Sequence, residues 1–110
     1  MNTGGSTTYA GNAYHTWAVK IDRRNADWKK QSITFWRDGS EYFKVTGADI
    51  DGRPNSGFDQ WADLAHKNFF MILNVAVGGK GSYPGETSPT TVSGIEAAMR
   101  VKYVAVYQSN

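Results

Sequence analysis

The sequence contains no cysteine. A chain without cysteine can form neither a disulfide framework nor a thiolate metal site. It also has little excess of either charge, because 12 Lys and Arg residues stand against 10 Asp and Glu residues, for a formal net charge of +2. The chain therefore lacks the basic stripe that is typical of nucleic-acid-binding proteins, and we expect no nucleic-acid partner.

Long apolar runs are missing as well. No segment approaches the roughly 20 apolar residues of a membrane-spanning helix, so we expect no membrane partner. The first 12 residues have neither the basic nor the apolar region of a signal peptide. At 110 residues the chain fits one domain, residues 1–110, and residues 1–13 are so rich in Gly, Ser, Thr and Asn that they predict a flexible N-terminal arm.

The most apolar stretch, residues 69–79, predicts a strand, because Phe, Ile and Val favour a pleated, well-packed surface. Side chains alternate between the two faces of a strand. One face is wholly apolar and is predicted to meet a core: Met71, Leu73, Val75 and Val77. The other face ends in Asn74 and Ala76. Asn74 either hydrogen-bonds a neighbouring backbone or faces a wet cleft, because a buried amide without a partner is costly.

Two further segments alternate in the same way. Residues 14–21 place His15, Trp17, Val19 and Ile21 on one predicted core face, and residues 99–108 predict a final strand. The charged residues 22–31 predict a loop with room for a helical turn, and residues 61–66 a short helical turn. Since no long helix is predicted, the expected fold class is all-β, an antiparallel sandwich.

Residues 32–46 predict a β-hairpin. A two-residue turn at Asp38-Gly39 pairs Phe35 with Tyr42 and Trp36 with Glu41, which scatters apolar groups over both faces. A three-residue loop with Gly39 left-handed in a bulge pairs Ile33 with Phe43, and we take this register. It gathers on one face the apolar side chains Ile33, Phe35, Phe43 and Val45, and it places on the other face Thr34, Trp36, Tyr42 and Lys44.

The carboxylates form no recognisable catalytic pair. Two carboxylates that act together in catalysis must lie close together in the fold, and the three Glu residues fall in unrelated segments: Glu41, Glu86 and Glu96. Asp49 and Asp51 lie in the turn-forming residues 47–60, where turn chemistry explains both residues better than catalysis does. The same stretch has Pro54 where an EF-hand calcium loop needs Gly, so an EF-hand is excluded, although a looser calcium site is not.

Four segments together resemble glycoside hydrolase family 16, and more narrowly its laminarinase-like endo-β-1,3(4)-glucanases. They are Y-H-T-W-A-V, S-I-T-F-W-R-D-G, F-F-M-I-L-N-V-A-V-G-G and M-R-V-K-Y-V-A-V-Y-Q, and they span residues 14–108. The resemblance implies a concanavalin-like β-jelly roll, an extracellular location and a β-glucan partner. It covers the C-terminal half of the family's catalytic domain, and the family's catalytic signature E-(I/L)-D-x-x-E is absent from this chain.

The resemblance also bears on individual residues. It implies that Asn74 faces the cleft and that Tyr83 lies near a sugar-lining Trp of the family. Trp36 and Trp61 are each either a sugar-stacking platform or a packing residue, because aromatic rings serve both roles. Lys102 stands where relatives often carry an Asp that contributes to a structural calcium site, so we expect no cofactor and disfavour calcium.

The two histidines favour structural interpretations. His15 lies on an apolar strand face and is predicted to be a hydrogen-bonded core residue, since buried polar groups are normally paired. His66, in a turn beside Lys67, is predicted to be solvent-exposed.

Two functions follow. The chain is either a portion of a β-glucan hydrolase that forms cleft wall and sugar subsites, with no catalytic residue of its own, or a non-catalytic β-glucan-binding module. A third, purely structural interpretation is a fragment that folds or assembles without binding sugar. Exposed strand edges recruit other chains. We therefore expect a homodimer formed by strand exchange, or pairing with a missing N-terminal half.

Overall fold

The computed structural model describes residues 5–8, 11, 13–75, 77, 80 and 85–109. The chain divides into two units, residues 1–69 and 70–110, and each is considered by itself. No helix in the part of the chain that the structure describes is long and apolar enough to cross a membrane.

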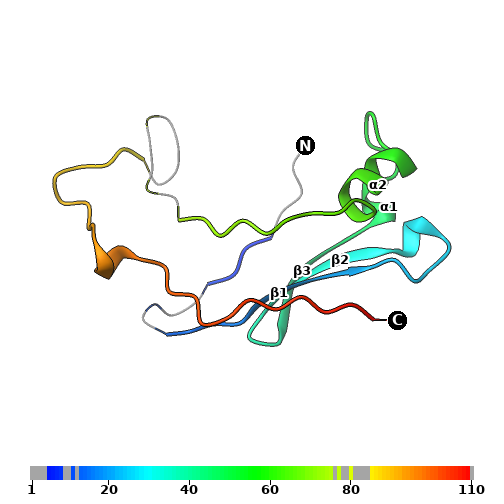
Figure 1. The fold of residues 1–110 in the computed structure, drawn as a ribbon. Coiled ribbons are helices and arrows are strands. Elements are labelled where there is room, and N and C mark those ends of the chain that lie inside the picture. The colour runs from blue at the N-terminus through cyan, green and yellow to red at the C-terminus, as the bar shows by residue number, and fades with distance from the viewer. Residues whose placement is uncertain are drawn as a thin grey trace. The chain divides into compact units, whose positions relative to one another are not determined.

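The first unit contains a three-stranded antiparallel sheet in the order β1-β2-β3 (Figure 1). The strands are β1 (Trp17–Asp22), β2 (Ser32–Arg37) and β3 (Ser40–Thr46), and the short 3-10 helix η1 (Trp28–Lys30) lies between β1 and β2. This sheet, with few and short helices, is consistent with the predicted all-β class. Within the described residues there is no second sheet, so the sandwich stays a prediction.

The hairpin register predicted above is wrong. The turn has two residues, Asp38 and Gly39, with φ of 49° and 81°, and Trp36 pairs with Glu41. A bulge in β3 then shifts the ladder by one residue, so that Phe35 pairs with Phe43 and Ile33 with Val45. The bulge is the physical reason for the error. It inserts Tyr42 as an extra residue in β3, so that a two-residue turn still leaves the predicted apolar side chains on one face. Gly39 is left-handed, as predicted.

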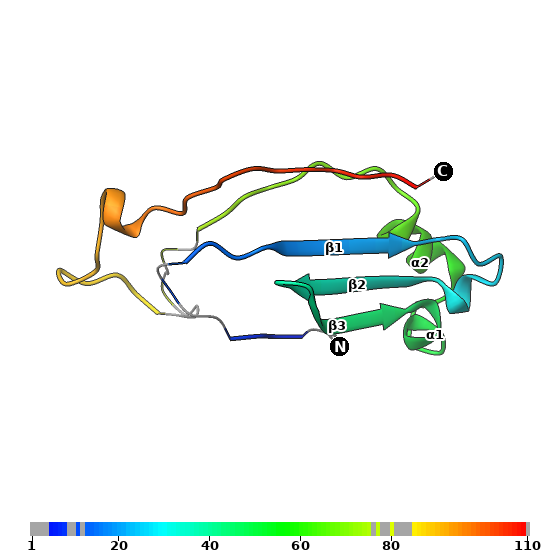
Figure 2. The same cartoon turned by 90° about the horizontal axis from the view of Figure 1, so that it is seen from below.

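A small core lies at one end of the sheet. The helices α1 (Gly47–Ile50) and α2 (Phe58–Ala65) follow β3 and lie where β1 and β3 end (Figure 2). The buried apolar residues are Val45, Ile50, Trp61 and Ala65, with Trp28, Ile33 and Phe43 packed against them. Residues 61–65 of the helical turn predicted over residues 61–66 are helical, and His66 follows the end of α2. Residues 47–50 were predicted as turn, but Thr46 and Asp49 form a capping box that starts α1.

The predicted core face of residues 14–21 is only partly buried. Trp17, Val19 and Ile21 share one face of the sheet with their partners on β2, and they are 49%, 57% and 40% exposed. The two short helices are the reason, since the described core lies at the Val45 end of this face and leaves β1 half-covered.

In the second unit the only helical element of the described residues is the 3-10 helix η2 (Ile95–Ala97). The strands predicted over residues 69–79 and 99–108 are not formed in the described part of these segments. Their predicted core residues are exposed, with exposed fractions from 50% to 63% for Met71, Leu73, Val75 and Val77. The alternation is real, but a strand also needs a neighbouring strand to accept its backbone hydrogen bonds. Ala76, Gly78 and Gly79 lie outside the described residues.

Candidate functional site

An aromatic cluster lies on the sheet face that carries Trp17 and Phe35. Tyr42 contacts both rings, with centroid distances of 6.3 Å to Trp17 and 6.3 Å to Phe35. The bulge in β3 accounts for this, because it turns Tyr42 to the face opposite the one predicted for it. Trp17 is 49% exposed. Exposed indole and phenol faces suit the C–H surfaces of sugar rings.

Asp38 ties the hairpin turn to the residues that precede β1. His15 Nδ1 lies 2.7 Å from Asp38 Oδ2, and the backbone N–H of Thr16 donates to Asp38 Oδ1 at 2.9 Å. An ionised carboxylate can only accept, so His15 Nδ1 carries the hydrogen. The hydrogen bond from His15, and then that from Thr16, holds the pKa of Asp38 below its usual range. His15 is therefore hydrogen-bonded as predicted, in a structural contact.

Trp61 lies in the core and exposes 0% of its surface. Its Nε1 donates to Gln31 Oε1 at 2.9 Å. The structure therefore gives Trp61 a packing role and places its ring where a sugar cannot stack on it. A buried indole N–H needs a partner, and Gln31 supplies it.

Gln31 is a residue that the sequence did not single out. It is 5% exposed, and its Nε2 donates to the carbonyls of Arg23 and Asn25 at 3.3 Å and 2.8 Å. These two bonds fix the orientation of the amide, so its oxygen must be the acceptor for Trp61. A single Gln at the edge of a charged loop carries no sequence signal for this role.

His66 is exposed, as predicted, and it also contacts two neighbouring side chains. Its Nε2 lies 2.7 Å from Gln31 Oε1, and its ring packs edge-on against Phe58 at 5.7 Å. Since Gln31 Oε1 can only accept, His66 Nε2 carries the hydrogen. His66 is thus an exposed residue whose ring is held by a hydrogen bond to Gln31 and a contact with Phe58.

The remaining predicted sugar-binding residues fall in different places. Trp36 is half-buried on β2 and, by the register, lies on the face opposite Trp17. Asn74 is exposed in the second unit. Tyr83 lies outside the described residues. Within the first unit, the structure therefore does not bring Trp36 and the buried Trp61 together into one site.

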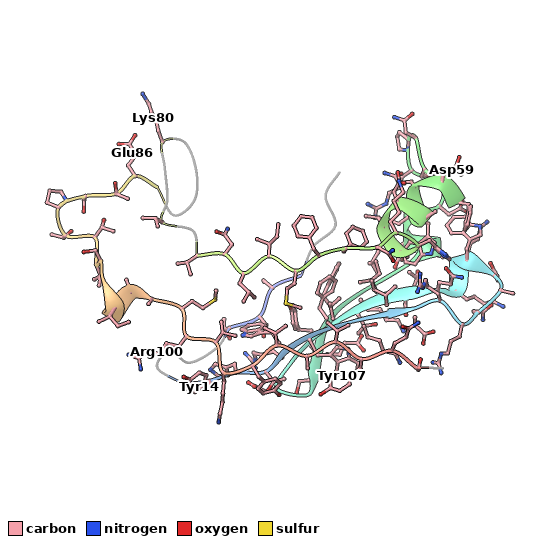
Figure 3. The ribbon with its side chains drawn as sticks, in the orientation of Figure 1. Tyr14, Asp59, Lys80, Glu86, Arg100 and Tyr107 are labelled. Atoms are coloured by element: carbon pink, nitrogen blue, oxygen red, sulfur yellow. The ribbon has the colours of Figure 1, made fainter. Side chains whose placement is uncertain are left out.

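The carboxylates are also dispersed along the chain. Glu41 lies in β3, Glu96 in η2, and Glu86 in the irregular segment before η2 (Figure 3). Asp49 caps α1, where the N–H of Thr46 donates to its Oδ2 at 2.8 Å and lowers its pKa. Asp51 pairs with Lys29 at 2.8 Å. Both Asp residues thus have the structural roles favoured by the sequence. Across the described residues, no three His, Cys, Asp or Glu side chains are grouped so as to hold a metal ion.

Comparison with known proteins gives one informative similarity. The chain is 32% identical over 102 residues to the protein named glucan endo-1,3-beta-glucosidase A1 from Niallia circulans. The matched region is 88% of this chain and 12% of that protein, so the chain spans a small part of its relative's length. This similarity relates the chain to a glucanase. No family model matches the chain. No solved structure matches it either.

The contact between half-exposed Trp17 and half-buried Tyr42 is a second feature that sequence reasoning missed. Alternation assigned Trp17 to the predicted core face of residues 14–21. The predicted hairpin register assigned Tyr42 to the face opposite Phe35 and Phe43. A signal was present, since aromatic residues recur along all three strands. Which of them remain exposed depends on what covers the sheet, and alternation does not contain that information.

Proposed function

We propose that this chain is a portion of a β-glucan hydrolase of the glycoside hydrolase family 16 type. The observation that supports this is its similarity, over 88% of the chain, to a protein whose name describes endo-1,3-β-glucan cleavage. In this proposal the chain supplies cleft wall and sugar subsites, and the catalytic carboxylates lie on sequence other than this chain. Two carboxylates suffice for glycoside hydrolysis, so the reaction needs no cofactor and no calcium.

The proposal extends to fold and location. The described sheet has an apolar face that is half exposed at Trp17 and Val19. Such a face is normally buried against a second layer. We therefore propose that the sheet belongs to a jelly-roll sandwich of an extracellular enzyme. Trp36, Asn74 and Tyr83 are the proposed sugar contacts, whereas buried Trp61 is not among them.

A glucan-binding module without turnover is the second candidate. Trp17, which is 49% exposed and in edge contact with half-buried Tyr42, favours it, because an aromatic surface on a sheet binds sugar without any catalytic group. The two candidates place the sugar on opposite faces of the same sheet, which makes them separable.

The test uses the 110-residue chain. We expect no hydrolysis of laminarin or mixed-linkage glucan, and calorimetric binding of laminari-oligosaccharides. Trp36→Leu and Trp17→Leu make the same change on opposite sheet faces and serve as controls for each other. Weaker binding in Trp36→Leu alone supports the cleft assignment, and weaker binding in Trp17→Leu alone supports the second candidate.

Two results would count against the first proposal. Hydrolysis by the 110-residue chain would show that its catalytic groups are present after all. Absence of binding to any β-glucan would remove the assigned subsites.

A further inference from the structure

An open hollow of about 430 Å³ lies beside the β1–β2 connection. Its lining is polar: Asp22, Arg24, Asn25, Lys30, Ser32 and Lys44. Ser32 and Lys44 alternate with Ile33 and Val45, so the hollow lies on the sheet face opposite the core. Its size is that of pockets for small molecules.

The one carboxylate of the hollow is already neutralised. Arg24 Nε and Nη2 donate to Asp22 Oδ1 and Oδ2 at 3.0 Å and 2.6 Å, which is a two-pronged contact. This pairing holds the pKa of Asp22 far below its usual range. Lys20 Nζ also lies near this carboxylate, 3.6 Å from Asp22 Oδ2. Asp22 therefore has no free charge to offer to a cation.

The two lysines of the hollow form weaker ion pairs than Arg24, or none. Lys30 Nζ is 4.0 Å from Asp27 Oδ2, at the limit of an ion pair, and 70% of its side chain is exposed. Among the described residues Lys44 makes no ion pair. The hollow thus carries an uncompensated positive charge.

Two neutral donors complete the lining. Asn25 Oδ1 accepts from the backbone N–H of Asp27 at 2.9 Å, which leaves the NH₂ group of Asn25 to donate. Neither this group nor the Ser32 hydroxyl is bonded to another side chain or backbone group in the described parts of the chain. Four residues with donor groups, Lys30, Lys44, Asn25 and Ser32, therefore line the hollow, and of these groups only Lys30 Nζ has a nearby acceptor among the described residues, Asp27 Oδ2 at 4.0 Å.

We propose that this hollow binds a doubly charged oxyanion, namely a sulfate or phosphate group. Such a group offers several strong acceptor oxygens to the four donors. Its negative charge also balances the positive charges of Lys30 and Lys44. The anion is either a free ion or a substituent on a sugar ring, for which the hollow has room. The inference rests on the contacts around Asp22, Lys30 and Lys44 and does not depend on the proposed glucan function.

The test is a titration of the full 110-residue chain, labelled with ¹⁵N, followed by amide chemical shifts. Sodium sulfate and inorganic phosphate are compared with sodium chloride at equal ionic strength, because screening alone shifts exposed amides. We expect saturable shifts at Asn25 and Ser32 with millimolar affinity. Titrations with glucose 6-phosphate, and with glucose as its uncharged control, then distinguish a sugar substituent from a free ion. Tighter binding of glucose 6-phosphate than of inorganic phosphate identifies the substituent.

The variants separate a built site from general attraction. Lys30→Gln and Lys44→Gln are each expected to weaken binding about threefold, and the double variant about tenfold, as for exposed charge pairs. Lys67→Gln removes the same charge from the end of α2, outside the hollow, and is expected to leave the affinity unchanged. All the replaced side chains are exposed, so spectra of the unliganded variants should keep the wild-type dispersion.

Shifts no larger than those in chloride would overturn the proposal. So would an equal loss of affinity in Lys67→Gln and in the double variant, because that result describes net charge and not a site.

Discussion

The amide of Gln31 makes four hydrogen bonds in the first unit. One amide joins the carbonyls of the β1–β2 connection to the indole of Trp61 and the ring of His66. At the scale of single residues, the stability of the first unit therefore depends on a polar group as much as on its few buried apolar ones. A buried donor that loses its acceptor pays the full cost of desolvation.

Gln31→Leu is expected to lower the free energy of unfolding by about 1–3 kcal/mol, because Trp61 Nε1 stays buried without an acceptor. Urea unfolding followed by tryptophan fluorescence measures the change. Gln60→Leu makes the same substitution at an exposed position of α2 and should change stability by less than about 0.5 kcal/mol. Equal effects of the two variants would contradict the role assigned to Gln31.

The lowered pKa of Asp38 predicts that the stability of the first unit depends on pH. Its pKa is lowered in the folded state, chiefly by His15, so the folded state binds its proton less readily than the unfolded chain does. The contribution of Asp38 is therefore fully present above the unfolded value of about 3.9 and is lost as the pH falls through the lower folded value.

Asp38→Asn tests this, since Asn tolerates the left-handed backbone at this position. The difference in unfolding free energy between the wild-type protein and the variant should shrink as the pH falls from 7 to below about 4. Urea unfolding across this range measures it. Glu41→Gln removes a like charge from the neighbouring strand and controls for overall charge. A constant Asp38→Asn difference at every pH would exclude the hydrogen bonds of Asp38 as the cause.

At the scale of elements, the hairpin depends on its turn. Asp38 and Gly39 both have positive φ, which matches the right-handed twist of the two strands that they join. The bulge that follows adds the extra residue that returns the apolar side chains to one face. Turn and bulge thus act together, and neither alone gives the observed register.

Gly39→Ala is expected to destabilise the first unit by about 1 kcal/mol, because a Cβ is disfavoured at φ of 81°. No neighbouring atom would contact that Cβ within 4 Å, so the cost is conformational. Gly11→Ala is the matched control, since a Cβ there also meets nothing within 4 Å and Gly11 lacks the positive φ. Thermal unfolding of both variants measures the difference, and an equal shift in Tm would contradict the turn assignment.

At the scale of the whole molecule, exposed apolar segments dominate the second unit. Phe70, Val106 and Tyr107 are 85%, 86% and 90% exposed. Extended apolar segments without ladder partners recruit other strands. The expectation of self-association therefore stands as a proposal, with strand exchange between copies as its form.

Light scattering is expected to show that the mass of the chain increases with concentration. Val104→Lys with Val106→Lys should reduce this association, because charges within a strand oppose its pairing. Ser109→Lys with Gln108→Lys adds the same two charges just beyond the apolar stretch and should have a smaller effect. A wild-type protein that stays monomeric at high concentration would contradict the proposal.

The sequence by itself determined which side chains share a face and where the chain turns. Ile33, Phe35, Phe43 and Val45 were placed on one face correctly, because alternation is a local property of extended backbone. The helical turn near Trp61 and the left-handed Gly39 follow from equally local rules. The relation to a glucanase also agrees with the resemblance that the strand sequences carry.

The tertiary structure decided the rest. The exact ladder required the bulge, whose energy depends on both strands at once. Whether Trp36, Trp61 or Trp17 keeps an exposed ring depends on what packs above each one, and Gln31 gained its role from groups that are distant in sequence. Residues 70–77 and 99–108 have the pattern of strands, but a strand exists only where a neighbouring strand accepts its hydrogen bonds. A local pattern specifies a face, and only the packed structure specifies what that face meets.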